Sequence, residues 1–564
     1  MSKEKDYGQY FTPLDVAEFM LSLSNAKPAK AKVLEPSCGE GVFLKALKSK
    51  DFKHVRAYEI DPTLKIQKQG YNLRIGSFIS AKETNNSYDL IIGNPPYVRW
   101  KNIPEHIKEE LKQYPAWGKD LNSLTDYLCV FILRSVNLLK EGGELIFITP
   151  EYWTQTQHAA KMRDFLCEHG DITHVVKLGE AKIFEQATVS TMIFRFIKKN
   201  KTPNSSKTTL EPNGSKTTSS PPTTTGPSTS AANLVGQQKL AYYDWAQRTK
   251  PTPKDWKKIK AALPKNMIPG PTTNKPWLLA DPEHFQEIST LEKACDKRMI
   301  DAVDIANGMV SGMDKAFKVT ELAEGKKLNT AEKAALIKVQ KSYSLDRFTP
   351  QLKEDYYFLL KPGSQPASEQ AFRKQYPTIH QHLQPHKTQL LQRYDYDKTL
   401  KYWQWAFPRS QHVFQNKSAK IFVPCKERIT NKDYLRFDLV PAGIYALQDV
   451  TALIPFKETK EDIHYLLAYL NHPTVMHWFK YCSINRGGVL EFSEGPLASL
   501  PFMSINFENK KEVELYKKIV QNTKDILKEL RSTKAPEERS GNKKAQRLIL
   551  TSEQLINKLI KVRS

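Results

Sequence analysis

Short apolar runs alternate with amphipathic stretches along the first 200 residues of the chain. Strands are predicted where apolar and β-branched residues cluster. They span residues 33–34, 55–59, 72–78, 88–92 and 144–150. Helices are predicted where apolar residues recur at helical spacing, at residues 14–21, 42–47 and 124–133. This alternation predicts an α/β domain, with one mostly parallel twisted sheet and helices on both faces. Residues 188–196 alternate in polarity, which predicts a strand of an antiparallel pair at the sheet edge.

The pattern of apolar positions stops near residue 198. Thr, Ser, Pro and Gly dominate up to about residue 232, and we predict disorder there because such a composition cannot bury a core. Apolar positions return near residue 240. The predicted segments are an α/β domain at 1–199, a low-complexity insertion or linker at 200–235, a completion of the first domain or a connector at 236–275, a mixed α+β domain at 276–505 and a basic helical tail at 506–564.

A polar turn follows the predicted strand at residues 88–92. Pro95 and Pro96 cannot continue the strand, so Asn94 is expected on a rigid turn at its carboxyl end. The Asn94 amide oxygen and the Pro95 carbonyl are two acceptors, which suit an exocyclic amino group with two donors. Tyr97 adds an aromatic face on which a flat ring can stack. For this tetrapeptide alone, an ordinary proline turn is the competing interpretation.

A glycine turn lies upstream, between a predicted strand and a predicted helix. Gly39 and Gly41 form the turn, and Glu59 ends the next predicted strand about 20 residues later. This arrangement is typical of a nucleotide-binding βα unit, in which an acid at that distance suits ribose hydroxyls. The third glycine of the dinucleotide fingerprint is missing, so a simple βα turn with a surface carboxylate at Glu59 is the alternative.

The net charge of +24, from 85 Lys and Arg against 61 Asp and Glu, is a large basic excess. It favours a polyanionic partner, which in a cytoplasmic chain means nucleic acid. The charged first residues predict no secretory signal, and no apolar run approaches the roughly 20 residues of a membrane span. The six cysteines form no CxxC pair, which argues against structural zinc and for a reducing compartment. We therefore expect a cytoplasmic, nucleoid-associated protein with no membrane segment and no metal.

The order of these motifs resembles the γ-class, TaqI-type N6-adenine DNA methyltransferases of restriction–modification systems. In that family a Thr-Pro segment, here Thr12-Pro13, precedes the cofactor loop, Asn-Pro-Pro-Tyr and a carboxyl-terminal recognition domain. Residues 8 to about 197 match in sequence, and the remainder matches mainly in placement. The resemblance implies a Rossmann-like methyltransferase domain that takes a methyl group from S-adenosyl-L-methionine. Its substrate would be N6 of an adenine flipped out of double-stranded DNA, and residues 276–505 would form the DNA target-recognition domain.

The resemblance also implies roles for individual residues. Asn94 and Pro95 would bind the target amine. Tyr97 and Phe184 would stack on the target base. Glu59 would hold the cofactor's ribose. The other expected cofactor contacts are Thr12, Glu35, Cys38, Gly39, Ile60, Ser77, Phe78 and Asn94. Ser77 departs from the family pattern, because an aspartate usually accepts the cofactor's adenine amine there and a hydroxyl is a weaker acceptor.

Basic residues of the second half are candidate DNA contacts, and for any single one a solvated surface charge is the competing interpretation. They are Lys401, Arg409, Lys417, Lys420, Lys426, Arg428 and Arg486. We find no metal-dependent nuclease motif in the sequence. The resemblance therefore implies either a separately encoded restriction endonuclease as partner or an orphan methylase.

Two other functions remain open at the level of sequence. RNA and protein-glutamine methyltransferases also use Asn-Pro-Pro-Tyr, although they are generally shorter and lack a large carboxyl-terminal domain. A catalytically weak DNA-binding modification subunit is the second alternative, and Ser77 motivates it. Cytosine N4 is also an exocyclic amine, and only the family resemblance favours adenine.

Overall fold

The computed structural model describes residues 10–98, 100–114, 127–184, 190–200, 238–325, 328–351, 354–361, 363–393, 400–429, 432–486, 488–533, 539 and 541–564. The chain forms two compact units, Met1–Glu283 and His284–Ser564. The predicted low-complexity segment, 200–235, lies almost wholly outside the described residues. Within the described residues, we find no helix with the length and hydrophobicity of a membrane span.

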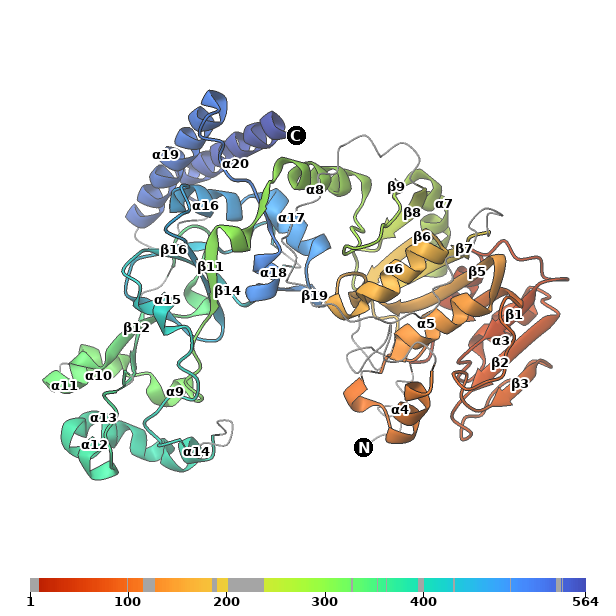
Figure 1. The fold of residues 1–564 in the computed structure, drawn as a ribbon, viewed down its shortest axis with the longest axis horizontal. Helices are drawn as coiled ribbons and strands as arrows, with labels where there is room; N and C mark the ends of the chain where they lie inside the picture. The colour runs from red at the N-terminus through yellow and green to blue at the C-terminus, as the bar shows by residue number, and fades with distance from the viewer. Residues whose placement is uncertain are drawn as a thin grey trace, which may run out of the picture. The chain divides into compact units, whose positions relative to one another are not determined.

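A nine-stranded sheet forms the centre of the first unit, in the order β3-β2-β1-β4-β5-β7-β6-β8-β9 (Figure 1). Its strands are β1 (Lys32–Glu35), β2 (His54–Glu59), β3 (Asn72–Ile75), β4 (Tyr88–Gly93), β5 (Leu139–Pro150), β6 (Gly170–Gly179), β7 (Thr191–Lys198), β8 (Lys239–Asp244) and β9 (Met267–Pro269). The first five strands run parallel. β1 pairs with β2 on one side and with β4 on the other, so the strand order reverses there. Open α/β sheets bind ligands beyond the carboxyl ends of the strands at such a point.

Helices cover both faces of this sheet, as the sequence predicts. They are α2 (Leu14–Leu21), α3 (Val42–Ser49), α4 (Glu105–Lys112), α5 (Tyr127–Leu138), α6 (Ala160–His169) and α7 (Pro253–Ala262). Leu90 and Ile92 of β4 share one core with α2, α3 and α7, and Phe19 stacks on Trp256 within it. Ile91 points to the opposite face, because side chains alternate along a strand. α5 and α6 lie across the sheet in Figure 1.

β7 lies inside the sheet, so its predicted position at the edge is wrong. It runs antiparallel to β5 on one side and to β6 on the other. Its residues 191–196 are all buried. The edge lies elsewhere because β8 pairs with β6 in parallel and β9 pairs with β8. Residues 239–269 therefore extend the sheet of the first unit.

The boundary between the units falls later in the chain than the predicted residue 275. Trp277 packs against Trp153 of the first unit, with ring centroids 5.1 Å apart. The backbone N–H of Trp277 donates to the Thr154 carbonyl, and Gln155 donates to the Trp277 carbonyl. These contacts hold the chain to the first unit up to helix α8 (Pro282–Ala294).

The second unit mixes strands and helices, as the sequence predicts. A four-stranded antiparallel sheet has the order β11-β18-β14-β16, and smaller sheets have the orders β13-β12-β17, β15-β20-β19 and β10-β21. Its strands are β10 (Lys297–Arg298), β11 (Val303–Asn307), β12 (Leu336–Gln340), β13 (Asp355–Phe358), β14 (Lys420–Pro424), β15 (Lys426–Arg428), β16 (Asp438–Val440), β17 (Ile444–Ala446), β18 (Val450–Pro455), β19 (Asn485–Arg486), β20 (Val489–Glu491) and β21 (Pro501–Phe502). Its remaining helices are α9 (Asp314–Phe317), α10 (Thr320–Glu324), α11 (Thr330–Ala334), α12 (Glu369–Gln375), α13 (Pro377–Leu383), α14 (Lys387–Leu391), α15 (Gln411–Gln415), α16 (Ile463–Leu470), α17 (Pro473–Cys482), α18 (Glu494–Ala498), α19 (Lys510–Ser532) and α20 (Lys543–Arg563).

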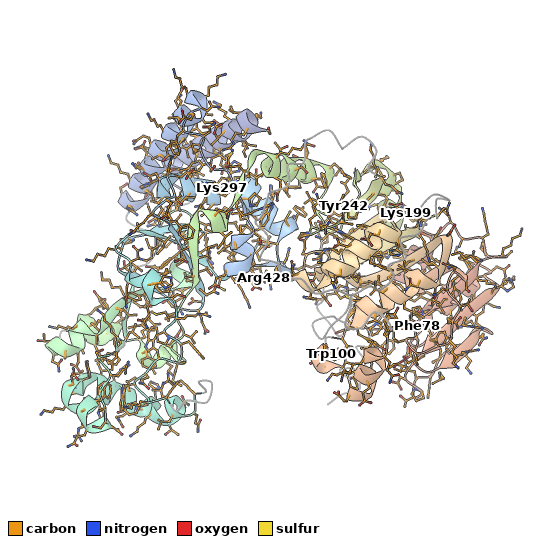
Figure 2. All side chains as sticks on the ribbon, viewed as in Figure 1. Phe78, Trp100, Lys199, Tyr242, Lys297 and Arg428 are labelled. Atoms are coloured by element: carbon orange, nitrogen blue, oxygen red, sulfur yellow. The ribbon has the colours of Figure 1, made fainter. Side chains whose placement is uncertain are left out.

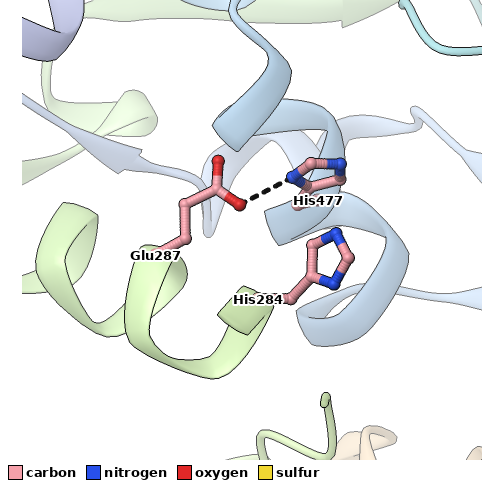
Figure 3. Close-up of side chains that lie close together, drawn as sticks. All are labelled: His284, Glu287 and His477. Carbon is pink, nitrogen blue, oxygen red and sulfur yellow. Dashed lines mark hydrogen bonds and ion pairs between the residues drawn. The ribbon is translucent and has the colours of Figure 1, made fainter. Parts of the chain in front are cut away.

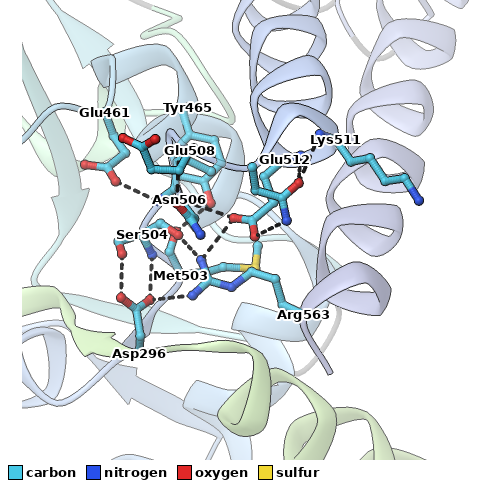
Figure 4. A network of polar contacts seen from close by, with 12 residues as sticks. Asp296, Glu461, Tyr465, Met503, Ser504, Asn506, Glu508, Lys511, Glu512 and Arg563 are labelled. Carbon is cyan, nitrogen blue, oxygen red and sulfur yellow. Dashed lines mark hydrogen bonds and ion pairs between the residues drawn. The ribbon is translucent and has the colours of Figure 1, made fainter.

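The carboxyl-terminal helices are part of this second unit. α19 and α20 pack against each other and against α16. Arg563, at the end of α20, forms ion pairs with Asp296 (3.0 Å) and with Glu512 (3.5 Å), and it donates to the Ser504 carbonyl (Figure 4). Glu512 is nearly buried and also accepts the backbone N–H of Asn506. The Arg563 guanidinium thus fastens the carboxyl-terminal segment, predicted as a tail, to Asp296 and to Ser504.

Replacing Arg563 with alanine is expected to lower the free energy of unfolding by about 2–3 kcal/mol, because the buried Glu512 carboxylate loses its cation. The measurement is the urea midpoint of the full chain, followed by tryptophan fluorescence. Lys511→Ala is the matched control, since Lys511 is exposed on α19 and its side chain extends away from the network in Figure 4. Equal midpoints for the two variants would contradict the assigned role of Arg563.

Candidate active site

The turn after β4 holds Asn94 in a defined orientation. Its side-chain amide nitrogen donates to the Tyr10 carbonyl (2.7 Å) and to the Thr12 hydroxyl (3.1 Å). The Ser37 hydroxyl donates to the backbone carbonyl of Asn94 (3.0 Å), which ties this turn to the end of β1. Pro95 is buried behind it. The two bonds made by the amide nitrogen determine which way the amide oxygen points.

The Asn94 amide oxygen is buried and has no hydrogen-bond partner among the described residues. A buried acceptor without a donor costs free energy, roughly 1–3 kcal/mol. Such a group is stabilised when a ligand brings a donor. The turn therefore presents a preoriented acceptor to a donor that the chain itself does not supply.

Three aromatic rings cluster beside this turn. Tyr97 and Tyr10 are stacked, with centroids 5.4 Å apart and an interplanar angle of 30°. Phe184 stands edge-on to Tyr97, at 6.2 Å and 65°, and it is nearly buried. The Tyr97 hydroxyl donates to the Ile148 carbonyl on β5 (2.8 Å), which fixes its ring relative to the sheet. Tyr10 rather than Phe184 is thus the ring that lies roughly parallel to Tyr97.

The glycine turn and Glu59 lie against each other. Gly39 and Gly41 have φ of +53° and +92°, a backbone region that strains other residues. A Cβ on Gly41 would also lie 2.7 Å from the Gln67 carbonyl oxygen. The Gly39 N–H donates to one Glu59 carboxylate oxygen (2.8 Å), and the Asp61 N–H donates to the other (2.9 Å). Burial raises the pKa of Glu59 in spite of these N–H donors.

One pocket contains both the glycine turn and the Asn94 turn. Its lining residues come from the segment before α2, from the carboxyl ends of β1, β2, β3 and β4 and the turns after them, and from α4, α5 and the residues just before α4. They are Tyr10, Phe11, Pro36, Ser37, Gly39, Glu59, Ile60, Gly76, Phe78, Asn94, Pro96, Val98, Ile103, Pro104, Ile107, Tyr127 and Phe131. Of the predicted cofactor residues, this lining brings together Gly39, Glu59, Ile60, Phe78 and Asn94. Phe78 is labelled in Figure 2.

The other predicted residues lie beside the pocket without lining it. Glu35 is fully buried at the end of β1, and both its carboxylate oxygens lack partners among the described residues. Burial, and then the charge of Glu59, raise its pKa well above the usual value. Gly93 allows this close packing, because a Cβ there would lie 2.9 Å from the Glu35 carboxylate.

Cys38 and Ser77 are engaged within the protein. Burial raises the pKa of the Cys38 thiol, which disfavours the reactive thiolate form. The Ser77 hydroxyl accepts the backbone N–H of Ile79 (3.1 Å). Its neighbours Gly76 and Phe78 line the pocket instead.

Sequence reasoning missed Tyr10, Ser37 and the apolar wall formed by Ile103 and Ile107. Ile107 lies in the first turn of α4 and Ile103 lies just before that helix, so no local pattern marks the two as one pocket wall. Tyr10 and Ser37 matter through contacts with Tyr97 and Asn94, which are distant in the chain. Only the fold brings these residues together.

The basic residues predicted to contact DNA have different environments in the second unit. Lys420 is fully buried, and its ammonium donates to the Asn416 and Ser418 carbonyls. Lys420 is therefore removed from the candidate DNA contacts, because a buried and internally satisfied ammonium does not reach a phosphate. Lys401 donates to the Pro366 and Ala367 carbonyls.

The other candidates lie nearer the surface. Arg409 donates through Nε to the Gly308 carbonyl (3.0 Å). Lys426 and Arg428 are exposed on β15 on either side of the buried Glu427, and Arg428 is labelled in Figure 2. Lys417 is also exposed. The side chain of Arg486 lies outside the described residues.

The sheet order, the glycine turn and the acid that ends β2 define the class as Rossmann-like, S-adenosyl-L-methionine-dependent methyltransferases. Comparison with known proteins agrees. Residues 15–184 match the family described as Eco57I restriction-modification methylase. The chain is 37% identical over 531 residues to the type II methyltransferase M.HindII of Haemophilus influenzae, covering 93% of this chain and 95% of that protein. It is 34% identical over 536 residues to M.HincII of the same species, with the same coverage.

The chain therefore belongs to the type II DNA methyltransferases of restriction–modification systems. The resemblance found in the sequence is confirmed at this level, and S-adenosyl-L-methionine is the cofactor. The solved structure of the type IIL restriction–modification enzyme MmeI in complex with DNA aligns with 98% of this chain and 72% of that one, at a TM-score of 0.59 and 11% identity. This likeness shows a shared fold.

Proposed function

We propose that this enzyme methylates N6 of adenine in a specific duplex DNA site, with the target base flipped out of the helix. The observation that carries the proposal is the buried Asn94 amide oxygen without a partner. An exocyclic amine is a donor that satisfies this acceptor. Accepting its hydrogen bonds keeps the nitrogen lone pair out of the ring and available for attack. The Pro95 carbonyl would be the second acceptor.

The residues around the pocket fit the cofactor of this class. Glu59 presents its carboxylate to the pocket and suits ribose hydroxyls, while Ile60 and Phe78 offer apolar surface to an adenine ring. Glu35 lies buried beside the pocket without a partner, and the positive charge of a bound cofactor would lower its raised pKa and favour the carboxylate. When bound, the cofactor supplies an electrophilic methyl group on a sulfonium centre. Pocket walls of Ile103, Ile107 and Phe131 would exclude water.

Tyr97 would stack on the flipped base and offset part of the stacking lost from the helix. A base between Tyr97 and Tyr10 needs two van der Waals gaps, about 7 Å between the rings. The rings are 5.4 Å apart. Tyr10 would therefore move aside when the base enters, and would then cover its second face. Since the Tyr10 carbonyl also accepts from Asn94, this motion would act on the catalytic amide.

Replacing Tyr97 with alanine is expected to lower kcat/KM by about 10–100-fold, since a base–aromatic stack contributes about 1–3 kcal/mol. Tyr97→Phe is the matched control, because it keeps the ring and loses only the hydrogen bond to Ile148, which costs less than about tenfold. Both are measured on a duplex carrying the recognition sequence. If Tyr97→Phe is as impaired as Tyr97→Ala, the anchoring hydroxyl and not the stacking ring determines activity.

The second unit would read the DNA sequence. Its exposed basic residues, including Lys417, Lys426 and Arg428, are proposed phosphate contacts, and Arg409 and Arg486 are retained as candidates. We propose duplex DNA as the partner and a separately encoded nuclease as the other half of the system.

The deciding experiment is methylation of plasmid DNA by the purified chain, followed by mapping of modified bases by long-read sequencing. The expected result is N6-methyladenine at one recurring sequence. N4-methylcytosine would overturn the base assignment. Modification of RNA or of a protein glutamine, with unmodified DNA, would favour the alternative substrates. Absence of any product with cofactor bound would favour a catalytically weak modification subunit.

A further inference from the structure

A cluster of three metal-ligating side chains lies in the second unit, apart from the residues of the proposed active site. His284 and Glu287 belong to α8, and His477 belongs to α17 (Figure 3). One ligand atom from each lies within 4.8 Å of the other two. All three side chains are half-buried. Glu287 and His477 are 190 positions apart in the chain, so only the packing of α8 on α17 brings the cluster together.

Helical spacing explains why these side chains face one another. His284 and Glu287 are three residues apart, so they share one face of α8. Thr474 and His477 have the same spacing and share one face of α17. His477 Nδ1 is hydrogen-bonded to one Glu287 carboxylate oxygen at 2.8 Å. The His284 and His477 rings lie edge to face, with centroids 4.3 Å apart. Two imidazoles and one carboxylate therefore lie side by side.

The donor set is suited to a zinc-class cation. Histidine nitrogens and a carboxylate oxygen are usual zinc ligands at about 2.0–2.2 Å, which places them about 3.3–3.5 Å from one another in a tetrahedron. The ligand atoms lie within 4.8 Å of one another, so side-chain rotations would have to bring them to that spacing when an ion binds. The Thr474 hydroxyl donates to the other Glu287 oxygen. Partners of this kind orient metal-bound carboxylates in known sites.

We propose that His284, Glu287 and His477 bind one divalent zinc-class cation, which clamps α8 against α17. Three protein ligands and partial exposure leave a fourth position for water. The ion would stabilise the first helix of the second unit. An imidazole–carboxylate pair without a metal would also explain the contact of Glu287 with His477, and in that arrangement His284 would contribute its ring contact with His477 and its charge near Glu287 but no ligand atom. The behaviour of His284 variants therefore distinguishes the two arrangements.

The test uses the untagged full-length chain, stripped of metal with a chelator and titrated with Zn²⁺ by calorimetry. The expected result is one Zn²⁺ per chain and a thermal unfolding midpoint that rises with Zn²⁺ and returns with EDTA. Absorption of the Co²⁺-loaded chain reports whether the coordination is tetrahedral. His284→Ala and His477→Ala are each expected to weaken Zn²⁺ binding by more than about tenfold.

The matched control is His412→Ala, which removes an exposed histidine on α15 and leaves the cluster intact. Glu287→Gln keeps the shape of the side chain and removes its charge. If its thermal unfolding midpoint without metal equals that of wild type, a loss of Zn²⁺ binding in this variant is not caused by misfolding. The proposal is overturned if the wild-type chain binds no Zn²⁺. It is also overturned if His284→Ala binds Zn²⁺ as tightly as wild type, because the ion then lies elsewhere, such as at the free cysteines.

Discussion

Replacing Asn94 with alanine lowers kcat by about 10²–10³-fold or more, while the Kd for DNA changes by less than about tenfold. The physical reason is that the amide oxygen would act mainly on the amine as it becomes the nucleophile, so its loss is felt in the transition state. In the structure this oxygen is held in place by two hydrogen bonds on the nitrogen side of the same amide. The measurement is single-turnover methylation together with equilibrium binding to the same duplex.

Asn137→Ala provides the matched control for that experiment. It makes the same exchange at an exposed position of α5 in the same unit. Its kcat is expected to stay within about twofold of wild type, because Asn137 does not line the pocket. If Asn94→Ala turns over as fast as wild type, Asn94 does not bind the target amine.

Replacing Glu59 with alanine abolishes measurable binding of S-adenosyl-L-methionine in calorimetry, at least about a 100-fold loss. Two contributions add in this variant. The ribose would lose its acceptor, and the backbone N–H groups of Gly39 and Asp61 would lose the carboxylate that they bond in the pocket wall. Each unsatisfied buried donor costs about 1–3 kcal/mol.

Glu40→Ala is the control for cofactor binding, since Glu40 is an exposed carboxylate in the same glycine turn. It is expected to bind the cofactor with unchanged affinity. Cofactor binding by the wild-type chain also tests whether Ser77 leaves the site degenerate. Unaltered affinity in Glu59→Ala would show that the cofactor lies elsewhere in the pocket.

Local sequence was enough to predict the turns that build the site. The double proline after an apolar run predicts a rigid turn carrying Asn94, and Gly39 and Gly41 predict a left-handed turn before a helix. Both predictions depend on residues within a few positions of one another. The mostly parallel sheet was also predicted from local patterns, because alternating strands and helices are compatible with few topologies.

Predictions that depended on distant neighbours were less successful. Lys420 has the sequence context of a surface cation, yet its ammonium is satisfied by the Asn416 and Ser418 carbonyls inside the second unit. β7 has an alternating pattern, yet it is buried on both sides because β8 and β9 extend the sheet past β6. The polarity pattern of residues 188–196 does not indicate how many further strands join the sheet after residues 200–235.

The amino-acid sequence alone was sufficient to determine the type of domain, the family and the residues of the Asn-Pro-Pro-Tyr turn, since these depend on short-range patterns and motif order. Tertiary packing decided which way the Asn94 amide points, that Tyr10 is the ring stacked on Tyr97, and that His284 meets His477. Each of these contacts joins segments that only the folded sheet and helices bring within bonding distance.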